Sequence, residues 1–294
     1  MRLPAGAFGH DHGRMSSRLR AIAQDNAEVV AAGGYRTRSG RQVSLAAAVT
    51  EATAAIRIYG PGPVEPDEWG ARVRSREPLR TRFEVTPESS TVAARRLAAD
   101  GPVAVLNFAS ARNPGGGYVR GANAQEEALC RASALYPTLL RAPEYYAAHR
   151  AQRSALYTDR VIHSPGVPVF RDDRGELLEE PFLAGFLTSP APNAGVVRRQ
   201  EPQRAHEIPA VLARRAERVL EVAALHGYPG LVLGAWGCGV FRNDPAEVAG
   251  TFRRLLTGRF AGTFAHVVFA VLDREGSTRR AFETAFAAQT GTTG

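Results

Sequence analysis

The stretch VAVLNFASARNPGGGYVRGANAQEEALCRASALY, residues 103–136, predicts a strand, a glycine-rich loop and a helix, in that order. Residues 103–109 read as one apolar strand of the type that is covered on both faces of a sheet. The loop contains three consecutive glycines, and we expect a helix over residues 124–136 that opens with a glutamine and two glutamates. Ligands of open α/β sheets bind beyond the carboxyl ends of the strands. The stretch therefore predicts both the class of fold and the place of a site.

The rest of the chain after Thr81 alternates between strands and helices in the same way. We expect strands at residues 82–86, 157–164, 182–189, 231–236 and 266–272, with a hairpin-like excursion at 167–176. We expect helices that open at Thr86-Pro87 and at Asp244-Pro245, and helices over residues 203–226 and 278–288. Such alternation indicates a largely parallel or mixed sheet with helices on both faces. The expected fold is a three-layer α/β/α domain with an N-terminal helical extension.

The domain organisation follows from where this alternation begins. We expect a disordered tail over residues 1–14, a helical extension over 15–75 and the α/β domain over 76–294. The extension contains a helix-like run over residues 17–32, which Gly33-Gly34 ends, and a Pro/Gly-rich connector over 59–78. Translation could start at Met1 or at Met15, since ordered-looking sequence begins just after Met15.

Composition limits the class of protein. The 294 residues are 44% hydrophobic and 22% charged, which is enough to bury a core. No run approaches the roughly 18 apolar residues of a membrane-spanning helix, and the N-terminus lacks the apolar region of a signal peptide. We therefore expect a cytoplasmic protein. Its two cysteines, Cys130 and Cys238, are too few for a disulfide framework, and they fit no zinc motif.

The charge excludes several kinds of chemistry. The net charge is +8, and all 37 basic residues are arginines. Without lysine there is no Walker A loop, no pyridoxal Schiff base and no kinase-type catalytic lysine. A basic surface suggests polyanionic partners, although scattered arginines are also what an ordinary solvated surface contains.

Two glycine-rich loops follow predicted strands. One covers residues 110–123, and the other is GAWGCGVFRNDP, residues 234–245. Both lead into helices, so their backbone N–H groups can converge on an anion. A chain without lysine must hold a phosphate in this way. Neither loop fits the GxGxxG dinucleotide fingerprint, and a plain tight turn remains the alternative for each.

Glu126 and Glu127 lie in the first turn of the predicted helix. Acidic residues are favoured there by the helix dipole, so capping alone would explain them. Adjacent helical residues diverge by about 100°, however, so the two carboxylates would have different tasks. One could contact substrate hydroxyls while the other faces a reacting bond. The residues by themselves leave capping and catalysis both open.

Several of these segments resemble one family. Three glycines, seven residues and then QEE resemble the signature of poly(ADP-ribose) glycohydrolases, and AWGCGVF (235–241) is similar to the diphosphate-binding loop of that family. The segments NFASARNPGGG, QEEALCRASALYP, HSPGVPVFRD and TSPAPN resemble the bacterial type. The resemblance extends from about Ser17 to the C-terminus.

This resemblance implies a macrodomain core that binds ADP-ribose and hydrolyses ribose–ribose O-glycosidic bonds, releasing ADP-ribose without a metal or a cofactor. We expect release from the chain end, with internal cleavage as the alternative. It implies that Glu127 is the catalytic residue and that Glu126 orients the ribose. The implied ADP-ribose-binding residues are Ser110, Asn113, Gly115, Gly116, Gly117, Gln125, Gly237, Cys238, Gly239, Val240 and Phe241. Either Ser110 or Asn113 would orient the ribose, and Phe241 would pack on the distal ribose and adenine.

The expected partner is poly(ADP-ribose) or another ADP-ribosylated macromolecule. We expect the protein to be a monomer and to bind no membrane. Alternatives are a hydrolase of mono-ADP-ribose and a macrodomain that binds ADP-ribose without cleaving it, although the intact glutamate pair disfavours the latter. A plain nucleic-acid-binding protein is disfavoured because no helix-turn-helix, RRM or zinc motif is present. The N-terminal helices could cover the adenosine end of the pocket or merely cover the sheet.

Overall fold

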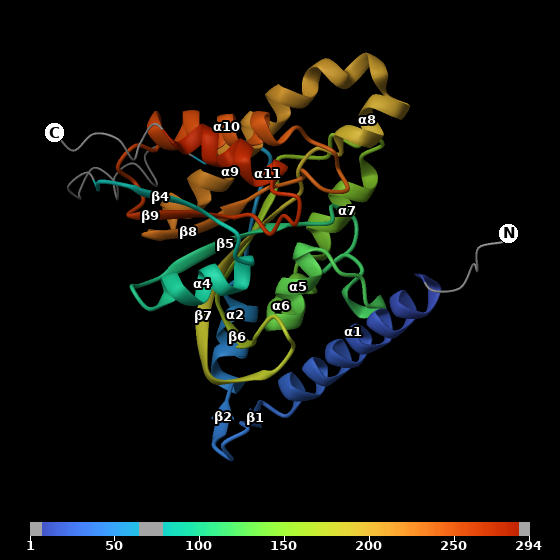
Figure 1. The fold of residues 1–294 in the computed structure, drawn as a ribbon, viewed down its shortest axis with the longest axis vertical. Coiled ribbons are helices and arrows are strands. Elements are labelled where there is room, and N and C mark those ends of the chain that lie inside the picture. The colour runs from blue at the N-terminus through green and yellow to red at the C-terminus, as the bar shows by residue number, and fades with distance from the viewer. Residues whose placement is uncertain (1–7, 65–78, 288–294) are drawn as a thin grey trace, which may run out of the picture.

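A mixed sheet of seven strands forms the centre of the protein (Figure 1). The structure, a computed structural model, describes residues 8–64 and 79–287. The strands are β3 (Arg57–Tyr59), β4 (Arg82–Thr86), β5 (Val103–Phe108), β6 (Val161–Arg171), β7 (Leu177–Ser189), β8 (Gly230–Gly234) and β9 (His266–Ala270). Their order across the sheet is β3-β6-β7-β5-β8-β9-β4, and β1 (Gly34–Arg36) pairs with β2 (Gln42–Ser44) in a separate ribbon.

Strand direction decides where ligands can bind. The five strands from β7 to β4 run parallel, and β3 and β6 are antiparallel to their neighbours. The carboxyl ends of β7, β5, β8 and β9 therefore meet at one edge of the sheet, where a ligand site of an α/β sheet is expected. The long β6–β7 hairpin includes the excursion predicted at residues 167–176 and extends it in both directions.

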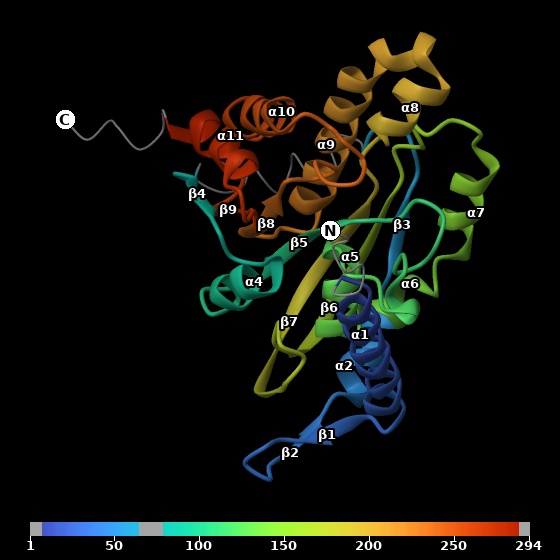
Figure 2. The same cartoon turned by 45° about the vertical axis from the view of Figure 1, so that its right-hand side comes forward.

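Helices cover both faces of the sheet, which gives three layers (Figures 1 and 2). They are α1 (Phe8–Ala31), α2 (Ala46–Ala54), α4 (Ser90–Ala98), α5 (Gln125–Ala132), α6 (Leu135–Leu139), α7 (Pro143–Ala151), α8 (Ala194–Gln200), α9 (Ile208–Leu225), α10 (Pro245–Thr257) and α11 (Ser277–Phe286). Two 3₁₀ turns, η1 (Tyr118–Arg120) and η2 (Pro202–Glu207), complete the elements. The three-layer prediction is confirmed.

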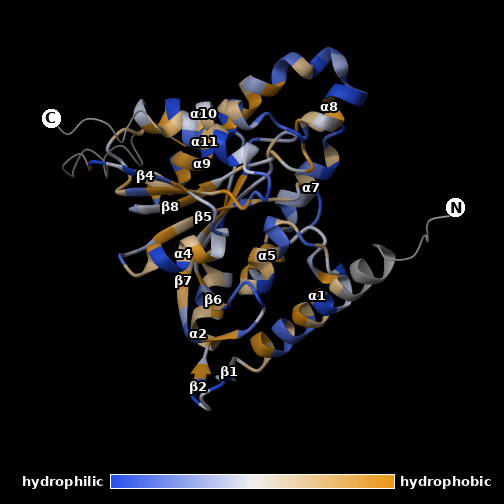
Figure 3. Cartoon of the chain, in the orientation of Figure 1, coloured by the Kyte–Doolittle hydropathy of each residue, from blue (hydrophilic) through white to orange (hydrophobic). Residues whose placement is uncertain are grey.

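The side chains of β5 point alternately into two hydrophobic cores, one on each face of the sheet. Val105 faces a core with the side chains of α4, α5 and α7, whereas Leu106 faces a second core with those of α9, α10 and α11. Successive side chains of a strand point to opposite faces, so a strand between two helical layers must be apolar at nearly every position. Figure 3 shows this concentration of hydrophobic residues on the central strands.

The N-terminal helix packs beside the loop that follows β5. The side chain of Asn26 donates hydrogen bonds to the carbonyls of Cys130 (3.2 Å) and Arg131 (2.8 Å) at the end of α5. The hydroxyl of Tyr118 in η1 donates to the carbonyl of Ala23 at 3.4 Å. The extension therefore supports the glycine loop and the helix that carries the glutamates.

The domain boundaries predicted from sequence differ from this arrangement in two places. Residues 8–14 are part of α1, where the sequence predicted a tail, and residues 1–7 lie outside the described residues. The extension is not purely helical, because β3 pairs with β6 and adds an edge strand to the main sheet. Most of the predicted connector, residues 65–78, lies outside the described residues.

Several helix limits also differ from the predictions. The helix expected at Thr86 begins at Ser90, because Thr86 ends β4 and the Ser89 hydroxyl accepts the N–H of Val92 at 3.1 Å as the cap. The helix expected over residues 124–136 stops at Ala132, because Ser133 is extended and bridges Val169 of β6. The chain then re-forms a helix as α6.

In the second half of the chain, strand β6 begins only at Val161, because Tyr157 has a left-handed backbone (φ 61°) that no strand permits. The helix expected from Gln203 starts as the 3₁₀ turn η2 and becomes α-helical at Ile208. The helix predicted at Asp244-Pro245 is confirmed, since the Asp244 carboxylate accepts two N–H groups of the first turn. Helices α7 and α8 and the β1–β2 ribbon were not predicted.

Candidate active site

The two glycine loops leave neighbouring parallel strands. Strand β5 pairs with β8 in the register Val105 to Val232, so residues 109–124 and 235–244 emerge side by side at the carboxyl edge. The ring of Phe108 packs against Gly234 at the end of β8, since a Cβ atom there would lie 3.1 Å from it. The sequence prediction placed both loops correctly at one edge of the sheet.

The first loop is bent tightly around the glutamates. Gly115 and Gly116 have positive φ values of 63° and 58°, which L side chains rarely adopt. A Cβ atom on Gly116 would lie 2.6 Å from Oε1 of Glu127 and 3.0 Å from Oε2 of Glu126. On Gly117 it would lie 2.6 Å from the Cβ of Ala122. The glycines are required for backbone conformation and for close approach to both carboxylates.

Glu127 is buried, with 7% of its surface exposed, and both of its oxygens are held by backbone N–H groups. Oε1 accepts from Gly117 at 2.8 Å, and Oε2 accepts from Ala124 at 3.1 Å. The second bond caps the start of α5, so the capping interpretation is correct for this oxygen. The first bond ties the same carboxylate to the glycine loop.

Glu126 is more deeply buried, with 3% of its surface exposed. Its Oε2 accepts the N–H of Ser110 at 2.6 Å, and its Oε1 accepts from Nδ2 of Asn107 at 3.3 Å. Burial raises the pKa of Glu126 to about 8; the Ser110 N–H opposes this rise and the charge of Glu127 adds to it. Burial thus favours the neutral form of the Glu126 carboxyl.

Gln125 was predicted to be an ADP-ribose-binding residue, but its side chain is hydrogen-bonded within the protein. Its Oε1 accepts the N–H of Phe108 at 2.9 Å, and its Nε2 donates to Leu106 O at 2.9 Å and to Ser90 Oγ at 3.1 Å. Both amide protons are thus used within the protein. The side chain pins the start of α5 to the end of β5 and positions the two glutamates that follow it.

The two residues considered for ribose orientation are placed differently. Ser110 presents its N–H to Glu126, and its hydroxyl accepts the N–H of Asn113 at 3.2 Å. Asn113 itself is exposed at the outside of the loop. Ser110 therefore organises the loop, while the amide of Asn113 is accessible to a ligand.

The second loop is fixed at its base and open at its tip. A Cβ atom on Gly237, whose φ is 73°, would lie 2.4 Å from Ala191 Cβ and 2.5 Å from Nδ2 of Asn243. Gly239, in contrast, has no atom within 4 Å of such a Cβ, and Val240 is 85% exposed. Burial raises the pKa of the Cys238 thiol to about 12, so it stays neutral.

Phe241 ends this tip and faces an aromatic neighbour. Its ring centroid lies 6.1 Å from that of Tyr157, and its carbonyl accepts the N–H of Gly195 in α8 at 2.9 Å. The predicted loop residues and the predicted glutamates are therefore brought to the same edge of the sheet, on adjacent strands.

Comparison with protein families identifies this arrangement. The family described as "Microbial-type PARG, catalytic domain" matches residues 23–172, a segment that contains the first loop and both glutamates. The chain belongs to this family. A search of curated proteins found no match.

Solved structures of bacterial poly(ADP-ribose) glycohydrolases (PARG) match over most of the chain. The Thermomonospora curvata PARG bound to the inhibitor ADP-HPD is 49% identical, with a TM-score of 0.81 over 93% of this chain and 99% of that one. The Deinococcus radiodurans PARG in complex with ADP-ribose is 48% identical, with a TM-score of 0.75 over 82% and 97% of the two chains. This protein is therefore a poly(ADP-ribose) glycohydrolase with a macrodomain-like fold.

The glycohydrolase site also contains residues that the sequence did not single out. Asn107 is fully buried in β5, and its Nδ2 donates to Glu126 and to Thr188 Oγ1 at 3.1 Å. The sequence does carry a signal for Asn107, because it is a polar residue near the carboxyl end of an otherwise apolar strand. Tyr145 and Tyr146 of α7 are buried too; burial raises the pKa of both, and the charge of Glu126 adds to the rise.

Arg215 of α9 positions the segment around Tyr157. Its fully buried guanidinium donates to the carbonyls of Leu156 (2.7 Å) and Pro190 (2.8 Å) and to Oδ1 of Asp159 (3.0 Å). It ties the segment before β6 to the end of β7. No local pattern could have revealed this role, because its partners are more than 20 residues away.

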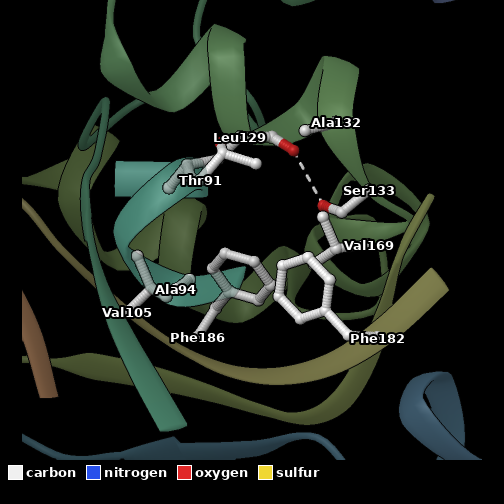
Figure 4. A pocket seen from close by; sticks show the side chains of 9 residues that line it. All are labelled: Thr91, Ala94, Val105, Leu129, Ala132, Ser133, Val169, Phe182 and Phe186. Carbon is white, nitrogen blue, oxygen red and sulfur yellow. Dashed lines mark hydrogen bonds between the residues drawn. The ribbon is translucent and has the colours of Figure 1, made fainter. Parts of the chain in front are cut away.

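A small apolar hollow lies behind α5, between that helix and the sheet (Figure 4). Val105, Leu129 and Phe186 are among its lining residues, and no charged side chain reaches it. The Ser133 hydroxyl at its rim donates to Leu129 O at 2.7 Å. Without a charged side chain, the hollow does not suit a phosphate-bearing ligand. We therefore distinguish it from the site at the carboxyl edge of the sheet.

Within residues 8–64 and 79–287, no cluster of three or more histidine, cysteine, aspartate or glutamate side chains is suited to a metal ion. The predicted tail residues His10, Asp11 and His12 lie in the part of α1 whose side chains are not described. None of the described helices has the length and apolar character needed to cross a membrane.

Proposed function

We propose that Glu127 is the acid and base of the hydrolysis and that Glu126 orients the ribose. The observation that carries this proposal is the position of both carboxylates directly behind Gly116. Since Gly116 has no side chain, a sugar ring can approach the two oxygens that face the loop. The backbone N–H groups of Gly117 and Ala124 hold Glu127 in one orientation for this purpose.

The roles differ because the environments differ. Cleavage of a glycosidic bond passes through an oxocarbenium-like state and needs an acid for the leaving oxygen, then a base for water. Glu127 would protonate the leaving oxygen and then take a proton from the attacking water. Burial favours the neutral form of Glu126, and in that form it can donate a hydrogen bond to a ribose hydroxyl without placing a second full charge beside the reacting carbon.

The second loop is proposed to hold the diphosphate. The Deinococcus radiodurans relative is solved with ADP-ribose, and this chain has no lysine for its phosphates. The N–H groups of Gly237, Cys238, Gly239 and Val240 would form the cradle, with Phe241 against the distal ribose and adenine. The open space at Gly239 and the exposure of Val240 support this assignment.

We further propose that ADP-ribose is released from the chain end. Helix α1 packs along η1 and α5, beside the glycine loop, so of the two alternatives left open by the sequence its position does not support the one in which N-terminal helices cover the adenosine end. Tyr157 and α8 lie beside Phe241 and are the better candidates for limiting that end of the pocket.

A time course on long automodified poly(ADP-ribose) tests this function. We expect ADP-ribose monomer as the only early product, resolved from oligomers by chromatography. Early free oligomers would show internal cleavage and refute the chain-end proposal, while the glycohydrolase activity itself would stand.

A further inference from the structure

Helix α5 holds the end of the glycine loop with two side chains of opposite charge. The carboxylate of Glu127 accepts the N–H groups at both ends of the segment 117–124. One helical turn later, the guanidinium of Arg131 donates from Nη1 to the carbonyl of Ala122 at 2.7 Å and from Nη2 to Oδ1 of Asn123 at 2.6 Å. The segment is therefore bonded to one helix through its donors and through its acceptors.

The segment 117–124 also closes on itself. The N–H of Ala122 donates to the carbonyl of Gly117 at 3.1 Å, and a Cβ atom on Gly117 would lie 2.6 Å from that of Ala122. Arg131 thus holds the residue against which Gly117 packs. Because Gly117 donates to Oε1 of Glu127, a shift of Ala122 would move this donor away from the carboxylate.

Arg131 differs from the other buried arginines in its partners. Only 7% of its surface is exposed, and both of its acceptors are oxygens of neutral groups. Burial lowers the pKa of its guanidinium, and the charge of Glu127, four residues earlier, opposes this shift. A buried cation without a direct ion pair is costly to a fold. Among the described residues, each of the other buried arginines contacts a carboxylate: Arg171, Arg215 and Arg218.

We infer that Arg131 is a positioning residue of the hydrolysis, which holds the segment 117–124 so that Glu127 keeps the orientation needed for proton transfer. The inference rests on the proposed function, which makes Glu127 the acid and base. The guanidinium acts through the loop, since both of its bonds lie within the protein. Its planar fork holds two acceptors in a fixed geometry, whereas an ammonium group is a point charge on a flexible stem. The fork, more than the charge, is what the reaction needs.

Two variants separate the fork from the charge. Arg131→Lys keeps the charge without the fork, and Arg131→Met removes both. Because a small misplacement of a catalytic group is costly, we expect kcat on polymer to fall about tenfold in the first variant and about 100-fold in the second. The affinity for ADP-ribose, measured by calorimetry, should stay unchanged, since the second loop is proposed to hold the diphosphate. Full kcat in Arg131→Lys, or a loss of affinity equal to the loss of kcat, would overturn the inference.

Arg218→Met is the matched control for the loss of a buried arginine. Arg218 is 4% exposed, and its ion pair with Glu221 lies within α9. This variant should lower the melting temperature at least as much as Arg131→Met and leave kcat unchanged. An equal fall of kcat in the control would show that lost stability explains the effect.

Asn123→Ala keeps the inference testable if Arg131→Met does not fold. Asn123 is exposed, so its substitution removes one acceptor of the guanidinium and leaves the core intact. We expect a smaller fall of kcat than in Arg131→Lys, with unchanged affinity for ADP-ribose. An unchanged kcat would count against the fork.

Amide hydrogen exchange measures the position of the loop independently of activity. The N–H groups of Gly117 and Ala124 are protected by their bonds to Glu127. Their exchange should be faster in Arg131→Lys, because local opening of the segment becomes easier, and unaltered in Arg218→Met. Unaltered exchange in Arg131→Lys would contradict the inference.

The double variant Glu127→Gln/Arg131→Lys tests whether Arg131 acts through Glu127. Residues that act as a unit are not additive, so the Arg131→Lys substitution should lower kcat little further once Glu127 is replaced. Additive losses would show that Arg131 acts on another step and would overturn the inference. Failure of the proposed function would be seen separately, as full activity of Glu127→Gln alone, whatever the Arg131 variants do.

Discussion

Glu127 and Gly116 are so close that any side chain at position 116 would meet the carboxylate: its Cβ would lie 2.6 Å from Oε1. The same Cβ would lie 3.0 Å from Glu126, so one glycine keeps open the space in front of both acids. The conformation of the loop, its hydrogen bonds to Glu127 and the access of substrate thus depend on one position without a side chain.

Replacing Gly116 by alanine should abolish activity. The methyl group would displace both carboxylates, and the left-handed backbone would add strain of about 1–2 kcal/mol. Gly40→Ala is the matched control, since Gly40 also has a positive φ of 90° but nothing within 4 Å. The Gly40→Ala substitution should add a similar strain energy and leave the activity unchanged. An active Gly116→Ala enzyme would show that the space is not used by substrate.

Replacing Glu127 by glutamine should lower kcat by about two to four orders of magnitude, because the amide can neither protonate the leaving oxygen nor accept a proton from water. The affinity for ADP-ribose should persist, because the amide oxygen can still accept the N–H of Gly117. Release of ADP-ribose from polymer and calorimetry with ADP-ribose measure the two effects. Glu180→Gln, at an exposed position, is the control for loss of charge. Near wild-type turnover would exclude Glu127 as the acid and base.

The raised pKa of Glu126 predicts a pH dependence of stability. The folded protein keeps this proton up to about pH 8, whereas the unfolded chain loses it near pH 4.3. The folded state binds more protons between these values, so its stability falls as pH rises through that window.

The variant Glu126→Gln has no such proton. The free energy of unfolding of the wild type, relative to this variant, should therefore fall by about 3 kcal/mol between pH 5 and pH 8. Urea unfolding at both pH values measures the difference. Parallel curves for the two proteins would show that Glu126 is ionised throughout.

Gly239 at the tip of the second loop and Gly237 at its base should respond differently to substitution. Gly239→Val should weaken binding of ADP-ribose about tenfold or more by obstructing the diphosphate, with little loss of thermal stability, since the surrounding space is open. Gly237→Ala should instead lower the melting temperature, because its Cβ would collide with Ala191 and Asn243. Unchanged affinity in a folded Gly239→Val protein would remove the loop from the phosphate site.

The sequence was informative wherever a structure depends on neighbouring residues. The apolar run at residues 103–109, the Asp244 cap and the glycines before QEE were all predicted, because strand burial, capping and positive φ are local requirements. The family resemblance added the roles of the glutamates, which local chemistry had left open between capping and catalysis.

Contacts between distant segments lay beyond these local rules. The helix expected to continue to residue 136 stops at Ala132, because Ser133 pairs with a strand more than 30 residues away. Gln125 was assigned to the ligand, but its amide is used by β5 and α4. A hydrogen bond that forms only after packing leaves no periodic trace in the sequence.

The sequence by itself thus determined the alternation of strands and helices that defines the fold class, the two loops at one sheet edge and the residue types of the proposed catalytic pair. Only the tertiary structure decided that Glu126 and Glu127 are unlike. Burial raises the pKa of Glu126 and favours its neutral form, whereas two backbone N–H groups hold the carboxylate of Glu127 at the loop. The physical reason is that desolvation depends on every segment packed around a group, and adjacent residues of one helix point into different surroundings.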